Sequence, residues 1–237
     1  MIGMTVWKEP CRRGILKANE LKKLLNFNLL KLNNLKGAII KMQKEKCAWC
    51  KDGCLNEKYH DYEWGIPIHD DKKQFEFLML EVMQCGLSWT LMLKKRETFR
   101  KCFDGFDYEK IAEYGEEKIQ SIMETPDMIK SVRKIKAIIS NAKAFIKIRE
   151  EYGSFDSFLW GYSNNKTLIY KSHQTQWVAS NELSDEIAKE LKKRGFKFLG
   201  SITVYSHLQA CGIINDHEEG CFMYREIAEN YPVEYRS

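Results

Sequence analysis

The feature that most constrains how this 237-residue chain can fold is a pair of segments, far apart in the sequence, that both carry thiols and imidazoles. The first, CAWCKDGCLNEKYH, holds Cys47, Cys50, Cys54 and His60, and the second, NDHEEGC, holds His217 and Cys221. Thiolate and imidazole are the usual ligands of a structural zinc ion, which binds four of them in a tetrahedron. A site shared by both segments would close a loop of more than 100 residues, which removes much of the entropy of the unfolded chain.

These residues also fit less specific interpretations. In one alternative they are separate buried cysteines and surface histidines. In another, Cys47 and Cys50 form a redox pair, although no thioredoxin-like βαβ pattern surrounds them. The chain is long, rich in lysine and without a secretory signal, so reduced thiols are expected rather than disulfides. We interpret the remaining histidines, His69, His173 and His207, as ordinary polar or core residues.

The composition is that of a globular protein that stays in the cytoplasm. Hydrophobic residues make up 44% of the chain and charged residues 30%, which is enough apolar material for a buried core. No apolar run approaches the roughly 20 residues that a membrane-spanning helix requires. The N-terminal stretch also lacks the compact apolar core and cleavage site of a secretory signal. We therefore expect no membrane association and a cytoplasmic location.

Residues 1–41 differ from the rest, so we predict a boundary before Met42 and one domain over residues 42–237. This extension contains nine Lys and Arg and two Glu, a net charge of +7, which leaves −2 for the remainder. Either the extension forms an amphipathic helix with its leucines on one face, or it is a translated upstream stretch and Met42 is the natural start. The charge of the domain itself does not indicate nucleic acid, so only local patches can.

Apolar residues at helical spacing predict an all-α fold, because no convincing set of alternating strands is present. The segment from Cys47 to about Pro67 is rich in Cys, Gly and Asp and is expected to be loop-like. The expected helices run from an N-cap at Asp71 to near Gly86, from a cap at Ser88 to about 103, over 107–114, 116–123 and 128–153, and from Ser184 to Gly195.

Glu81 lies within an apolar run, FEFLMLEVMQCGLSW, on one of these helices. A carboxylate desolvated among such neighbours is costly unless it has a partner, and it tends to have a raised pKa and a functional role. The alternative is that Glu81 turns to the solvent face of the helix.

Four aromatic residues lie around these segments, namely Trp49, Tyr59, Trp64 and Trp89. Flat rings together with one carboxylate suit a planar, electron-poor or cationic ligand. The rings stack on such a ligand and attract its charge, and the carboxylate accepts hydrogen bonds from its N–H groups. The alternative interpretation is that the rings belong to the core.

Basic stretches occur at residues 93–101, 129–136 and 189–198. Each is usually a solvated helix face, but together such stretches can line a track for phosphates. Residues 123–134, METPDMIKSVRK, also predict a short helix, a proline-bearing turn and a new helix. The free backbone N–H groups of such a hairpin can face a phosphate.

Three of these segments together resemble a known family. CAWC…YHDYEWGIP, LEVMQCGLSW…LKKRETFRKCF and, most specifically, LKKRGFKFLGSITVYSHLQACGIINDHEEGC are similar to bacterial 3-methyladenine DNA glycosylase I over about residues 47–221. The resemblance implies an all-α fold of the helix-hairpin-helix glycosylase superfamily, with two helical subdomains. It also implies one structural zinc ion per chain that ties the two ends together. Its ligands would be Cys47, His60, His217 and Cys221, with Cys47 chosen by the family spacing to the histidine of YHD.

The resemblance also implies roles for the pocket and for the DNA-binding residues. Glu81 would recognise the methylated base, with Tyr59 and Trp89 as stacking walls and Trp49 and Trp64 completing the pocket. The GLS turn would approach the opened duplex with Leu87 as the wedge, and the hairpin around 126–134 would hold the DNA backbone. The expected DNA-binding residues are Gly86, Leu87, Ser88, Lys130, Arg133 and Lys134. Asn56 stands where the family commonly has an aromatic residue, so one pocket wall is expected to differ.

The implied activity is hydrolysis of the N-glycosidic bond of 3-methyladenine in alkylated double-stranded DNA, which leaves an abasic site. We expect a monofunctional enzyme, because no Lys occupies the matched pocket positions to form a Schiff base, and we expect a monomer. One alternative is a non-catalytic, zinc-stabilised DNA-binding module. Another is a zinc hydrolase acting on a small molecule, against which a site with four protein ligands argues.

Overall fold

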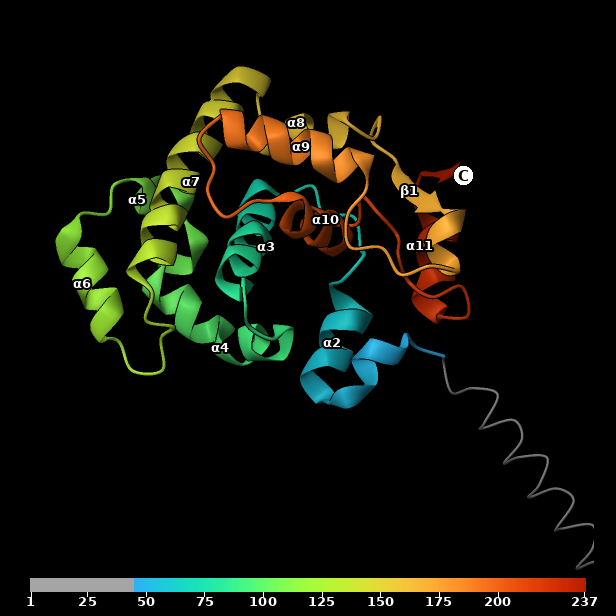
Figure 1. Ribbon diagram of the computed structural model, residues 1–237, viewed down its shortest axis with the longest axis horizontal. Helices are drawn as coiled ribbons and strands as arrows, with labels where there is room; N and C mark the ends of the chain where they lie inside the picture. The colour runs from blue at the N-terminus through green and yellow to red at the C-terminus, as the bar shows by residue number, and fades with distance from the viewer. Residues whose placement is uncertain (1–44) are drawn as a thin grey trace, which may run out of the picture. The chain divides into compact units, whose positions relative to one another are not determined.

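Helices account for nearly all of the secondary structure in residues 45–237, the part of the chain that the computed structural model describes. In chain order they are α2 (Cys54–Tyr62), α3 (Asp71–Gln84), α4 (Trp89–Cys102), α5 (Tyr108–Ala112), α6 (Glu116–Glu124), α7 (Val132–Tyr152), α8 (Phe155–Gly161), α9 (Glu182–Lys193), α10 (Ser201–Ala210) and α11 (Phe222–Asn230) (Figure 1). Short 3-10 helices lie at η1 (Ala48–Asp52), η2 (Asp104–Phe106) and η3 (Lys171–Gln174). The predicted helical class is therefore right for the main part of the structure.

A two-stranded parallel sheet departs from the all-α prediction. Strand β1 (Thr167–Tyr170) pairs with β2 (Val233–Arg236), and Leu168 also forms a bridge with Ile214. Each strand has only four residues, and its partner lies far away in the sequence, so neither strand has a clear local pattern. The sheet holds the C-terminal end of the chain against the segment that follows α8.

Two predicted helix starts and one predicted loop are wrong in detail. Asp70, rather than Asp71, caps α3. Asn181, rather than Ser184, caps α9, because Ser184 lies at the third helical position and completes a capping box with Asn181. The segment from 47 to 67, expected to be loop-like, contains η1 and α2.

Two other predicted helix ends are confirmed. The side chain of Ser88 accepts a hydrogen bond from the backbone N–H of Leu91 and caps α4. Gly153 ends α7 with a φ of 83°, in the left-handed region that glycine adopts at little cost. Helix α7 begins at Val132, four residues later than expected.

Helix α3 runs through the centre of the fold and is buried along nearly its whole length. It contacts α4, α7, α8 and α10, and the side chains of Phe75, Phe77, Leu78 and Leu80 on it are fully buried. A helix whose residues are buried on every face lies in the core. An acidic residue on this helix is therefore carried into the interior.

Arg96, in the first basic stretch, does not lie on a solvated face. Its guanidinium donates to both carboxylate oxygens of Glu63, at 2.8 and 2.7 Å, and to Glu76 at 2.8 Å. Arg96 and Glu76 are both buried. Bidentate pairs of this kind are strong and directional, so Arg96 fixes α4 against α3 and the end of α2.

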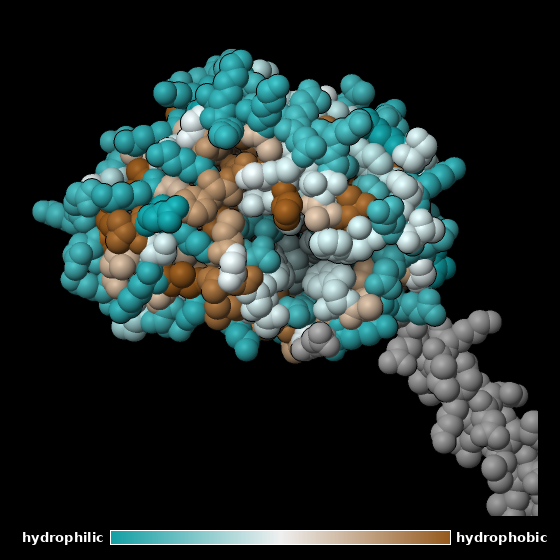
Figure 2. Space-filling model, viewed as in Figure 1, coloured by the Kyte–Doolittle hydropathy of each residue, from teal (hydrophilic) through white to brown (hydrophobic). Residues whose placement is uncertain are grey.

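The boundary predicted before Met42 lies outside the described residues. Residues 45–237 form one compact unit, and their division into two helical subdomains stays a prediction. Within this part of the chain, no helix is long and apolar enough to cross a membrane. Figure 2 shows hydrophilic side chains over much of the visible face, with apolar side chains between them.

Candidate functional site

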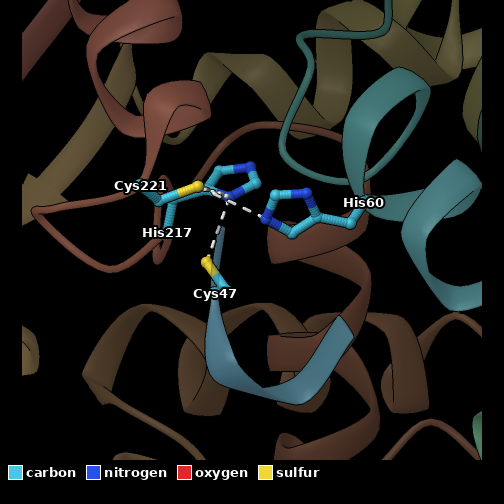
Figure 3. A group of neighbouring side chains, drawn as sticks. All are labelled: Cys47, His60, His217 and Cys221. Atoms are coloured by element: carbon cyan, nitrogen blue, oxygen red, sulfur yellow. Dashed lines mark hydrogen bonds between the residues drawn. The ribbon is translucent and has the colours of Figure 1, made fainter. Parts of the chain in front are cut away.

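The four residues predicted to bind a metal lie together, although they come from opposite ends of the described chain (Figure 3). All four are buried, and their ligand atoms lie within 4.8 Å of one another. Cys47 Sγ is 3.5 Å from His217 Nδ1, and Cys221 Sγ is 3.4 Å from His60 Nε2. Ligand atoms on a tetrahedron with metal bonds of about 2.2 Å lie about 3.6 Å apart. This cysteine–histidine cluster can therefore hold a metal ion.

Neighbouring groups fix which nitrogen each imidazole turns into the cluster. His60 Nδ1 lies 2.8 Å from one carboxylate oxygen of Asp61, and Lys46 Nζ lies 2.6 Å from the other. The Nε2–H group of His217 donates to the backbone oxygen of Trp64 at 3.0 Å. A ligating histidine usually donates its other N–H to a carboxylate or carbonyl. His60 thus presents Nε2 to the cluster, and His217 presents Nδ1.

The other two cysteines of the first segment stay outside the cluster. The Cys50 thiol donates to the backbone oxygen of Cys47 at 3.1 Å, and Cys54 is exposed at the start of α2. This placement agrees with the choice of Cys47 over both. A hydrogen bond from the Cys47 thiol lowers the pKa of Cys221, which favours the thiolate, the form that binds metal.

Glycine at position 65 leaves room for one of the imidazoles. Its φ is +80°, and a Cβ there would lie 2.7 Å from His217 Nε2. In Gly65→Ala the added methyl group would overlap the imidazole and is expected to push His217 out of place. The left-handed backbone costs the alanine a further amount of about 1–2 kcal/mol. We expect metal affinity to fall by about tenfold or more, as measured by competition with a chromophoric chelator.

Gly161→Ala is the matched control for this change. Gly161 lies in α8, and a Cβ there would have nothing within 4 Å. Equal metal affinity in Gly65→Ala and the unmodified protein would contradict the role of Gly65 in seating His217.

A cavity of about 510 Å³ adjoins the cluster, with Cys47 among its lining residues. Its volume is within the range of small-molecule sites. Residues of α2, α3 and α10 line it, and Figure 2 shows the face hollowed between these helices. It brings together all five residues predicted to form the pocket, Trp49, Tyr59, Trp64, Glu81 and Trp89.

Glu81 is 5% exposed and lines this cavity from α3, so the alternative that it turns to solvent is wrong. Burial alone raises the pKa of Glu81 to about 8. Among residues 45–237, no side chain forms an ion pair or hydrogen bond with its carboxyl group. That group is available to a ligand with N–H groups or a positive charge.

The aromatic rings form two groups around the cavity. Tyr59 and Trp89 contact each other, with centroids 5.0 Å apart and planes tilted by 48°. A base stacked between two rings needs them roughly 7 Å apart, so this pair forms a corner and not a slot, and its role as two stacking walls stays a prediction. Trp49 and Trp64 have centroids 5.0 Å apart, and Trp64 packs on His217 at 4.5 Å. This second group links the cavity wall to the cysteine–histidine cluster.

Sequence reasoning missed Asp216, a further carboxyl group in the cavity lining. It accepts hydrogen bonds from Gln209 Nε2, at 2.8 Å, and from the Tyr205 hydroxyl, and it lies 2.9 Å from His173 Nδ1. His173, which we interpreted as an ordinary residue, also lines the cavity and holds Asp216 in place. The one signal in the sequence is the position of Asp216 directly before His217.

Asn56 is not part of the cavity lining, although the family pattern suggested a pocket wall there. Its side chain is buried and exchanges hydrogen bonds with the Thr90 hydroxyl at 3.1 and 3.2 Å. Because Thr90 directly follows Trp89, this pair ties α2 to the start of α4 beside the pocket.

The residues predicted to bind DNA differ in exposure. Gly86, Leu87 and Ser88 form an exposed turn between α3 and α4, with Gly86 at a φ of +80°. Lys130 and Arg133 are exposed around the start of α7. These five residues are accessible to a large ligand.

Lys134 is buried, unlike the other predicted DNA-binding residues. Its ammonium donates to the backbone oxygens of Met83 and Cys85 at 2.6 and 2.9 Å. The predicted direct contact of Lys134 with DNA is at odds with this placement, because the charge is engaged inside the protein.

The structure is mostly helical and has a cavity lined by aromatic rings and a buried carboxyl group, a combination that suits a planar ligand with N–H groups or a positive charge. The chain belongs to the methyladenine glycosylase family, whose sequence model matches residues 49–224. The family predicted from the sequence is therefore confirmed.

Relatives in this family match almost their whole length. The chain is 41% identical over 181 residues to DNA-3-methyladenine glycosylase 1 of Escherichia coli, which covers 76% of this chain and 97% of that protein. It is 37% identical to DNA-3-methyladenine glycosylase of Haemophilus influenzae, with coverage of 74% and 96%. One similar solved structure is that of 3-methyladenine DNA glycosylase I from Staphylococcus aureus, reported as the structural basis of its recognition of 3-methyladenine. Its TM-score is 0.71 at 36% identity. It covers 75% of this chain and 95% of that chain.

Proposed function

We propose that this protein is a DNA repair glycosylase that releases 3-methyladenine from alkylated double-stranded DNA and leaves an abasic site. The observation that carries the proposal is the carboxyl group of Glu81, buried in a cavity lined by aromatic rings. A module that only bound DNA would have no reason to keep a desolvated acid there. The names of the relatives, which match over nearly their full length, support the same activity.

The chemistry of the substrate explains why such a cavity suffices. Methylation at N3 makes the adenine cationic and already a good leaving group. The enzyme must flip the nucleotide out of the duplex, at a cost of a few kcal/mol that is smaller for a damaged base. It must then stabilise a transition state in which positive charge moves from the base to the sugar. Glu81 accepts hydrogen bonds from the adenine edge, and a water molecule attacks the anomeric carbon.

We infer that the enzyme is monofunctional. Among the described residues that line the cavity there is no lysine, so none of them can form a Schiff base with the sugar. The other lining carboxyl groups are engaged by the protein. Asp216 accepts from Gln209 and Tyr205, and Glu218 accepts from the backbone N–H of Ala48 at 2.7 Å. Glu81 is therefore the carboxyl group that remains for the base.

We propose that α6, the segment 125–131 and α7 form a helix-hairpin-helix element that holds the DNA backbone. Lys130 and Arg133 are exposed there and suit phosphate contacts, whose strength falls with salt concentration. Leu87 is 38% exposed on the neighbouring turn, where an apolar side chain can fill the space that a flipped nucleotide leaves.

We also propose that the cysteine–histidine cluster holds one structural zinc ion. Two thiolates and two imidazoles in a buried site are a set that zinc prefers, and four protein ligands leave no open position. This argues against the alternative of a zinc hydrolase. Thiolate ligands persist in a reducing compartment, which supports a cytoplasmic enzyme, and we expect it to act as a monomer.

Release of free base from methylated DNA tests the proposed function. We expect the metal-loaded protein to release 3-methyladenine and to leave abasic sites in equal number, with no release from unmethylated DNA. Release is measured by chromatography of the soluble fraction. Tight DNA binding without release would favour the non-catalytic module. A covalent complex trapped by borohydride would contradict a monofunctional mechanism.

A further inference from the structure

A buried lysine joins the two segments proposed to contact DNA. Lys134 lies in the first turn of α7, within the hairpin and just after its connecting segment 125–131, and is 9% exposed. Its ammonium donates to the carbonyl of Met83, in the last turn of α3, and to that of Cys85, which follows the helix. The next residue, Gly86, begins the exposed turn.

The position of this ammonium gives a favourable electrostatic interaction and carries a desolvation cost. The last carbonyls of a helix lack intrahelical partners and lie at the negative end of its dipole, so a cation suits them. After α3, Cys85 (φ −39°, ψ 109°) and Gly86 (φ +80°) form a turn in which the Leu87 N–H donates to the Gln84 carbonyl at 2.6 Å, and not to the carbonyl of Met83 or Cys85. Burial, however, lowers the pKa of Lys134, and no carboxylate of the described residues forms an ion pair with it. A buried cation held by carbonyls alone is costly.

The hairpin is fixed to both helices that flank the turn. Lys95 on α4 donates to the backbone oxygen of Asp127, in the hairpin, at 2.7 Å. Lys134 makes the corresponding link to the end of α3. The turn 86–88 lies between α3 and α4, so its position relative to the hairpin depends on these two lysines.

We propose that Lys134 is a positioning residue that sets the Gly86–Ser88 turn relative to the DNA-binding hairpin. When the hairpin binds phosphates, the turn then lies at the position needed to open the duplex at the damaged base. Lys134 acts through the backbone of α3 and does not touch the base. This role rests on the proposed function, and it replaces the direct DNA contact predicted for Lys134.

Lys134→Met tests this role by separating opening of the duplex from binding of the base. We expect excision from methylated duplex DNA to fall by about tenfold to a hundredfold, because small misplacements are costly. Excision from methylated single-stranded DNA, where the base need not leave a duplex, should change much less. Affinity for free 3-methyladenine, measured by quenching of the cavity tryptophans, should stay unchanged. Lys147→Met, an exposed position on the same helix, controls for the loss of one positive charge.

The outcomes separate this role from a merely structural one and from the proposed function. Equal losses on duplex and single-stranded DNA, or full duplex excision, would overturn the positioning role. If Lys134→Met does not fold, Lys134→Arg is used instead, because it keeps the charge but widens the head group. The ratio of excision from duplex DNA to excision from single-stranded DNA then decides the question. Failure of the unmodified protein to release base from either DNA would refute the proposed function itself.

Discussion

Replacing Glu81 by glutamine is expected to lower the release of 3-methyladenine from methylated DNA by about 10²–10³-fold. Glutamine has nearly the same shape, so the core around α3 should stay packed. It cannot carry a negative charge, and it places an amide N–H group where the carboxylate accepts hydrogen bonds. Single-turnover release of the free base, with protein in excess, measures this effect on the chemical step.

The matched control is Glu229→Gln, which removes an exposed acid on α11. Its excision rate should equal that of the unmodified protein. Both variants should show the same circular dichroism and the same metal content as the unmodified protein. Full excision by a folded Glu81→Gln variant would refute the role assigned to Glu81.

The pH dependence of excision provides a second test of the same carboxyl group. The pKa of Glu81 is raised from an ordinary value of 4.5 to about 8 in the folded protein. Because the folded value is the higher one, Glu81 contributes stability that is complete below the unfolded pKa and is lost as pH rises through about 8. A cationic nucleotide favours the ionised carboxylate. We therefore expect kcat/KM to rise with pH up to about 8 in the unmodified protein and to lack this rise in Glu81→Gln.

The parts of the site that could be predicted from sequence are those in which residue type alone is informative. Cysteine and histidine are uncommon, and their spacing, together with the family resemblance, indicates a metal site. Its residues are Cys47, His60, His217 and Cys221, which the structure brings together. The apolar neighbours of Glu81 likewise indicated a core helix, although they left the direction of its side chain open.

The parts that could not be predicted depend on contacts between distant segments. Lys134 lies in an ordinary basic stretch, and nothing in the sequence shows that its partners are two backbone carbonyls at the end of α3. Asp216 becomes part of the cavity only because Tyr205 and Gln209 on α10 hold it there. The strands β1 and β2 are similar, since each is four residues long and exists through its partner.

Replacing Cys221 by serine is expected to release the metal ion and to lower the midpoint of thermal unfolding by roughly 10–20 °C. Cys47 and His217 are 170 residues apart in the sequence. A cross-link that closes a loop of this size stabilises a protein by about 5 kcal/mol, and metal binding to a preformed site acts in the same direction. Metal content by mass spectrometry and unfolding by calorimetry measure the two effects.

The same change is expected to weaken binding of 3-methyladenine, although none of the metal ligands is proposed to contact the base. Trp64 packs on His217 with centroids 4.5 Å apart, and Trp49 packs on His60 at 5.6 Å. Both tryptophans line the cavity, so loosening the histidines moves its wall. The control is Cys54→Ser, at an exposed position outside the cluster. A chelator should lower both the unfolding midpoint and the base affinity of the unmodified protein, and it should not lower them further in Cys221→Ser. If Cys221→Ser kept the same midpoint and the same base affinity, the four residues would be core residues only, and the two ends of the domain would be held together without a metal ion.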